Sequence, residues 1–131
     1  MNQFNVFGFL DDMNLSFSLA SICNINGYNL IFPNVKYYKL ELSMVKYGIV
    51  IIDINDKKID AYALAGYLHQ DTGFLIVGYL DTLNRKEKLH AQKAGFDIVM
   101  NRDTLFRNLD IILTQAAREI GESKSTNKKN K

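Results

Sequence analysis

The sequence has little of what several protein classes require. Its one cysteine, Cys23, excludes an internal disulfide and a metal cluster built from the cysteines of a single chain. No apolar run approaches the roughly 18 residues that a membrane span needs, and no basic region precedes an apolar one near the N-terminus. The glycine-rich phosphate loops of nucleotide-binding α/β proteins are also missing. We therefore expect a cytoplasmic protein with no membrane partner.

The net charge of +2 is unevenly distributed over the 131 residues. Residues 121–131 carry four lysines and one glutamate, whereas the first 120 residues carry 12 basic and 13 acidic residues, a net charge of −1. This nearly neutral body does not favour nucleic acid as a partner. The polar, lysine-rich end is typical of disorder. We predict one domain over residues 1–120, large enough for a proper core, and a disordered basic tail over 121–131.

Five short apolar runs predict strands, at residues 4–10, 28–32, 48–53, 74–79 and 97–100. Helical periodicity follows four of them, ending at Asn26-Gly27 in the first interval and at Gly95 in the fourth. The interval 33–47 fits both a strand and a helix. Because parallel strands need a crossover at each connection, helix is favoured there. The chain therefore predicts an α/β fold, (βα)5, with a doubly wound five-stranded parallel sheet.

Charged residues stand where several predicted strands end. Asp11 and Asp12 follow the first strand, Asp53 closes the third, and Arg102 follows the fifth. In doubly wound folds these ends form one crevice, where ligands bind. Hard cations such as Mg²⁺ prefer carboxylate oxygens, and carboxylates this close repel one another unless a cation neutralises them. The fourth strand ends in Gly78 and Tyr79.

Each acidic residue has more than one interpretation. Asp53 is a nucleophile, a metal ligand, or an acid that caps a helix or a loop or pairs with Arg102. Asp11 and Asp12 are metal ligands, or turn and N-cap residues of the following helix.

These residues resemble those of a response-regulator receiver domain of the CheY-like superfamily, along residues 4 to about 120. The acidic doublet closes strand one, an aspartate closes strand three, and Asn55 stands where the family uses a backbone carbonyl as a metal ligand. The stretch KAGFDIVMNRDTLFRNLDIIL is similar to the family region AGA(D)DYLxKPxxxxxLLxxI.

The resemblance implies strand order 2-1-3-4-5 and a signalling protein that is not an enzyme. It implies that Asp53 accepts a phosphoryl group from a histidine kinase or a phosphotransfer protein. Mg²⁺ is the implied candidate cofactor, held by Asp11, Asp12, Asp53 and Asn55. The implied output is docking onto a downstream protein, and a homodimer is a further candidate partner.

The sequence departs from the family at the residues that report phosphorylation. The family has Thr or Ser at the end of strand four, where Gly78 aligns, or Leu80 if the count starts from Ala94-Gly95. The small residue that normally follows is Tyr79. The family's lysine is Arg102 and its switch aromatic is Val99, and neither change is conservative.

These departures leave three hypotheses. The first is a stand-alone atypical receiver in a phosphorelay, with Asp53 as phosphoacceptor. The second is a pseudo-receiver that works through protein contacts without phosphorylation. The third is a flavodoxin-like binder of a small phosphorylated ligand, which the acidic crevice disfavours.

Overall fold

The computed structural model describes the backbone of residues 4–129 and the side chains of residues 4–120. Strands and helices alternate along it in this order: β1 (Asn5–Phe9), α1 (Met13–Asn26), β2 (Asn29–Ile31), α2 (Tyr38–Ser43), β3 (Gly48–Asp53), α3 (Ala61–Asp71), β4 (Leu75–Leu80), α4 (Arg85–Ala94), β5 (Ile98–Asn101) and α5 (Arg102–Lys129). The ambiguous interval 33–47 contains the short helix α2, as the crossover rule predicts.

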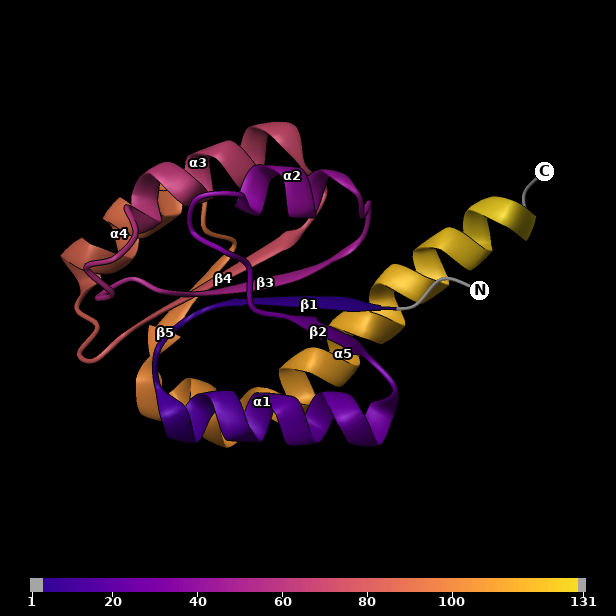
Figure 1. Ribbon diagram of the computed structural model, residues 1–131, viewed down its shortest axis with the longest axis horizontal. Helices are drawn as coiled ribbons and strands as arrows, with labels where there is room; N and C mark the ends of the chain where they lie inside the picture. The colour runs from indigo at the N-terminus through magenta and orange to yellow at the C-terminus, as the bar shows by residue number, and fades with distance from the viewer. Residues whose placement is uncertain (1–3, 130–131) are drawn as a thin grey trace.

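The strands form one parallel sheet in the order β2-β1-β3-β4-β5. Helices α1 and α5 cover one face, and α2, α3 and α4 cover the other (Figure 1). The predicted doubly wound fold and its strand order are both confirmed. The chain reverses its winding direction at β1 and β3, so this is the pair whose carboxyl ends open a ligand crevice in such folds.

Alternating side chains of the strands divide the core into two layers. In β3, Val50 and Ile52 pack toward α3 and α4, whereas Ile49 and Ile51 pack toward α1 and α5. All four are at most 1% exposed. A strand buried on both faces explains the continuous apolar run in the sequence, and it places Asp53 at the point where burial ends.

Polar caps fix where the helices begin beside this edge. Asp12, Asp60 and Asn84 accept hydrogen bonds of 3.1, 3.1 and 2.8 Å from backbone N–H groups of the first turns of α1, α3 and α4. Gly27 (φ 73°) ends α1 and Gly95 (φ 127°) ends α4, both as predicted. Three of these five residues, Asp12, Gly27 and Gly95, were already marked by the sequence as cap or helix-end candidates.

The backbone of the last helix, α5, runs from Arg102 to Lys129. The side chains of 121–129 and all of 130–131 lie outside the described residues, and the disordered basic tail stays a prediction. Among the described residues, no helix is long and apolar enough to cross a membrane.

Candidate acidic crevice

Five of the predicted site residues stand at one edge of the sheet. β1 leads to Asp11 and Asp12, β3 ends at Asp53, and Arg102 is the first residue of α5, directly after β5. In the register of β3 with β4, Asp53 stands beside Tyr79. Acidic, basic and phenolic groups therefore share the carboxyl edge of the sheet.

Asp53 is a partly exposed carboxylate held by its own loop. Its Oδ1 accepts a 2.9 Å hydrogen bond from the backbone N–H of Asn55. The side-chain oxygen of Asn55 accepts from the backbone N–H of Asp81 at 2.9 Å, which fastens the loop after β3 to the loop after β4. Burial raises the pKa of Asp53, and the carboxylates of Asp56, Asp81 and Asp12 raise it further, against the Asn55 bond. Among residues 4–120, Asp53 forms no ion pair.

Asp12 is bound by groups of this chain at both of its oxygens. Oδ1 caps α1 by accepting from the backbone N–H of Leu15, and Oδ2 pairs with Nε of Arg102. Arg102 also lies 3.5 Å from the carboxylate of Asp103. The Arg102 hydrogen bond holds the pKa of Asp12 below its ordinary range. Arg102 therefore pairs with Asp12 rather than with Asp53, and the N-cap interpretation of Asp12 is confirmed.

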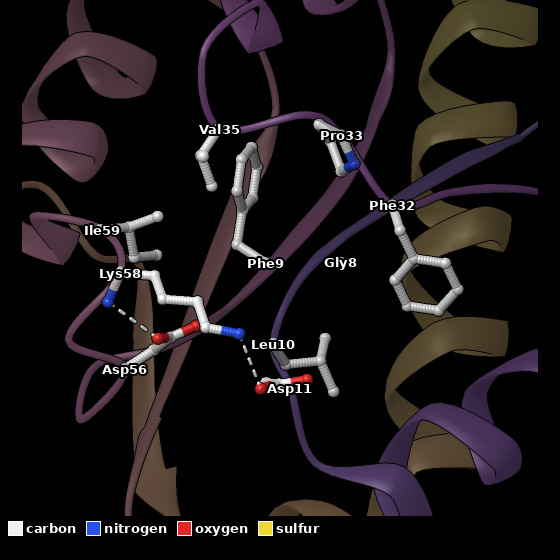
Figure 2. Close-up of a pocket in the computed structure, with 10 residues that line it drawn as sticks. All are labelled: Gly8, Phe9, Leu10, Asp11, Phe32, Pro33, Val35, Asp56, Lys58 and Ile59. Carbon is white, nitrogen blue, oxygen red and sulfur yellow. Dashed lines mark hydrogen bonds and ion pairs between the residues drawn. The ribbon is translucent and has the colours of Figure 1, made fainter.

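Asp11 is neutralised by a cation from another loop. Nζ of Lys58 lies 2.9 Å from Oδ2 of Asp11 and joins the loop after β3 to the loop after β1 (Figure 2). Both side chains are largely exposed, so the pair exchanges readily with water. Each member of the acid pair consequently has its own basic partner.

Tyr79 places a buried hydroxyl next to these charges. The residue is 1% exposed, and within the described residues its Oη has no hydrogen-bond partner. Burial raises its pKa strongly, with Asp53 and Asp12 adding to the increase, so the phenol stays neutral. Tyr79 therefore places a neutral phenol, buried among the described residues, beside the Asp53 carboxylate.

The other two predicted switch residues face away from the crevice. Gly78 turns toward α3 and α4, where an added Cβ would lie 2.6 Å from the ring of Phe96 and 2.8 Å from Ile54. Val99 is paired with Gly78 in the register and belongs to the same core layer. A side chain at position 78 would therefore force Phe96 and Ile54 to shift in the core.

A divalent metal does not fit the crevice as it is arranged. Within the described part of the chain, no three His, Cys, Asp or Glu side chains lie close enough to hold one. Of the predicted side-chain ligands, Asp11 and Asp12 are already paired with Lys58 and Arg102. Mg²⁺ is usually held through one or two carboxylates and several waters, and at either of these aspartates it would compete with a basic side chain.

Sequence reasoning missed the ion pair of Lys58 with Asp11 and the burial of the Tyr79 side chain beside Asp53. The signal for Lys58 was electrostatic, because two adjacent carboxylates need positive charge and Lys57-Lys58 follows in the facing loop. The signal for Tyr79 was the parity of β4, whose alternate residues face opposite helical layers.

No protein-family model matches the chain, and no curated protein matches it. Solved structures do match. HP1043, an orphan response regulator of H. pylori, is 14% identical with a TM-score of 0.68 over 86% of this chain and 92% of that one. A protein described as an atypical orphan response regulator with a phosphorylation-independent regulatory mechanism is 14% identical with a TM-score of 0.70, over 88% and 96%.

A response regulator from Burkholderia pseudomallei, described with a phosphorylated aspartic acid, a calcium ion and citrate, is 16% identical with a TM-score of 0.69. It is matched over 95% of this chain and 75% of its own. The chain thus has the fold of CheY-like response-regulator receiver domains, and its structural neighbours include orphan and atypical regulators.

Proposed function

We propose that this chain is an atypical receiver that acts as a phosphorylation-independent docking module in signalling. One observation carries the proposal: Arg102 and Lys58 neutralise the acid pair, where an ordinary receiver would use a divalent cation. Both cations are side chains of this chain, so the acid pair is neutralised without a bound metal ion, and the proposed function requires no phosphoryl signal.

Tyr79 supports the same function. Its ring is buried on β4 in register with Asp53, so it occupies space beside the carboxylate. Arg102 forms its ion pair with Asp12 and leaves Asp53 without a basic partner among the described residues. An incoming phosphoryl group would therefore meet a carboxylate of raised pKa surrounded by other carboxylates, with no cation directed at it.

A second candidate is phosphotransfer to Asp53 from a histidine kinase or phosphotransfer protein in the cytoplasm. This function is favoured by the place of Asp53 at the carboxyl end of β3 and by its partial exposure. Its carboxylate forms no ion pair within the described residues. In this case Mg²⁺ would compete with Lys58 and Arg102 for Asp11 and Asp12.

Amide spectra of the protein with Mg²⁺ and the phosphate mimic beryllofluoride separate the two functions. We expect no shifts around residues 11–12, 53 and 78–82 in the wild type. Shifts that appear in the wild type and vanish in Asp53→Asn would replace the proposed function with phosphoacceptance. Asp56→Asn, which changes a neighbouring loop carboxylate, is the matched control for a general change of charge.

A further inference from the structure

The edge of the molecule over residues 32–47 exposes a concentration of apolar side chains. Six of the twelve exposed large hydrophobic side chains among residues 4–120 lie in this segment. Leu40 on α2 and Tyr37 and Met44 at its two ends follow helical spacing and are 68, 62 and 83% exposed. Tyr38, Leu42 and Val45 of the same segment pack on the core instead. The segment therefore buries one set of apolar side chains and leaves another exposed.

Positive charge surrounds this apolar stripe. Lys36, Lys39 and Lys46 lie in the segment, and none of them forms an ion pair within residues 4–120. The acidic residue of the segment, Glu41, accepts a 3.0 Å hydrogen bond from the backbone N–H of Asn34, which holds the preceding loop against α2. A symmetric contact with a second copy would bring like charges together, whereas an acidic partner would be attracted.

A pocket adjoins the stripe at its N-terminal end. Its volume is about 130 Å³, and its walls combine apolar side chains, with Phe9, Phe32, Val35 and Ile59 among them, with the charged side chains of Asp11, Asp56 and Lys58 (Figure 2). A cavity of about 150 Å³ accepts a molecule the size of benzene. The pocket therefore has room for one large apolar side chain. It also lies at the carboxyl ends of β1 and β2, next to the Lys58 ion pair.

Hydrogen bonds hold the pocket wall and the stripe together as one surface. The Asn34 side chain accepts from the backbone N–H of Lys36 at 2.8 Å, and its backbone carbonyl accepts from that of Tyr37 at 3.1 Å. The Glu41 bond ties the same loop to α2. A preformed concave surface favours a protein segment with a protruding side chain over a lipid bilayer, which has no feature that would fill the pocket.

We propose that this α2 surface, made of Phe32, Val35, Tyr37, Leu40 and Met44 with Lys36 and Lys46, docks an acidic segment of a partner protein. One large apolar side chain of the partner enters the pocket beside Val35, and the partner's carboxylates face the lysines. The inference rests on the proposed function, because a docking module needs a surface at which its partner binds.

A displayed library of random short peptides, selected on the full chain, tests this surface. We expect the recovered peptides to be rich in Asp and Glu around one large apolar residue. Val35→Ser, and the pair Lys36→Glu with Lys46→Glu, should each weaken their binding about tenfold or more. The matched controls are Ile25→Ser, a residue 78% exposed on α1, and Lys86→Glu with Lys88→Glu on α4, which should leave binding unchanged.

Four results would overturn the proposal: no recovered peptide, peptides without acidic character, binding that survives Val35→Ser, or equal losses in the controls. Sedimentation with phosphatidylserine vesicles that depends on Lys36 and Leu40 would reassign the surface to a membrane. Dimerisation that Leu40→Ser abolishes would reassign it to a second copy of the chain. The beryllofluoride experiment reports on the crevice alone, so failure of the docking surface and failure of the proposed function are distinguishable.

Discussion

Replacing Arg102 with alanine should destabilise the protein by removing the cation that neutralises Asp12. Exposed ion pairs contribute about 0–1 kcal/mol, whereas removing one member of a buried pair costs roughly 3–5 kcal/mol. The Arg102 and Asp12 side chains are 28 and 20% exposed, between these two cases. We therefore expect Arg102→Ala to lower the free energy of unfolding at pH 7 by about 1–2 kcal/mol.

Urea denaturation at several pH values measures this loss and identifies its cause. Arg102 keeps the pKa of Asp12 below its ordinary value of 3.8, so the ionised form of Asp12 favours the folded state. This contribution is complete above pH 3.8 and disappears as the pH falls through the lower folded pKa. The difference between wild type and Arg102→Ala should therefore be constant near neutral pH and shrink in strong acid.

Two control variants isolate the ion pair. Arg107→Ala removes an exposed arginine of the same helix and should change stability by less than about 0.5 kcal/mol. Asp12→Asn keeps an oxygen that can cap α1, and combining it with Arg102→Ala gives the coupling energy of the pair. A coupling near zero, or a loss that stays the same in acid, would refute the electrostatic role of Arg102.

Three further variants, the last with a matched control, test the charge of Asp53, the buried hydroxyl of Tyr79 and the backbone conformation of Gly95. Because burial and neighbouring carboxylates raise the pKa of Asp53, its ionised form opposes folding. Asp53→Asn should therefore stabilise the protein by roughly 0.5–1 kcal/mol in urea at pH 7, and not below pH 3.8, where both states are protonated. Tyr79→Phe removes a buried hydroxyl without a partner among residues 4–120 and should raise the melting temperature, whereas a lower one would reveal a hydrogen bond of Oη. Gly95→Ala should cost more than about 1 kcal/mol by calorimetry, because φ is 127° and the new Cβ would lie 2.8 Å from the carbonyl of Ala65. Gly66→Ala in α3, where the new Cβ would lie 3.6 Å from the carbonyl oxygen of Ala94, should instead be neutral or stabilising.

The fold was accessible from the sequence because its signals are local. The apolar run that ends at Asp53 marks a strand buried on both faces, and Gly27 and Gly95 mark the ends of two helices. Their alternation decides even the ambiguous segment that contains α2, since parallel strands need crossovers.

The crevice was only partly accessible, because its state depends on which charged groups meet in space. The sequence places Asp12, Asp53 and Arg102 at one edge of the sheet, but it leaves open which carboxylate the arginine takes. It gave no role to Lys58, which reaches Asp11 from a loop 47 positions away in the sequence. The side of β4 on which Tyr79 lies required the strand register, since a shift of one residue exchanges the two faces.

Direct titration with Mg²⁺ is the sharpest test of whether Lys58 and Arg102 neutralise Asp11 and Asp12 in place of a metal ion. Isothermal calorimetry would compare the wild type with Lys58→Ala combined with Arg102→Ala, and with Lys57→Ala combined with Arg107→Ala as a control of equal charge. We predict no saturable binding at millimolar Mg²⁺ in the wild type or the control, and saturable binding once Lys58 and Arg102 are removed. Saturable binding by the wild type with an affinity equal to that of the double variant would contradict internal neutralisation of the crevice.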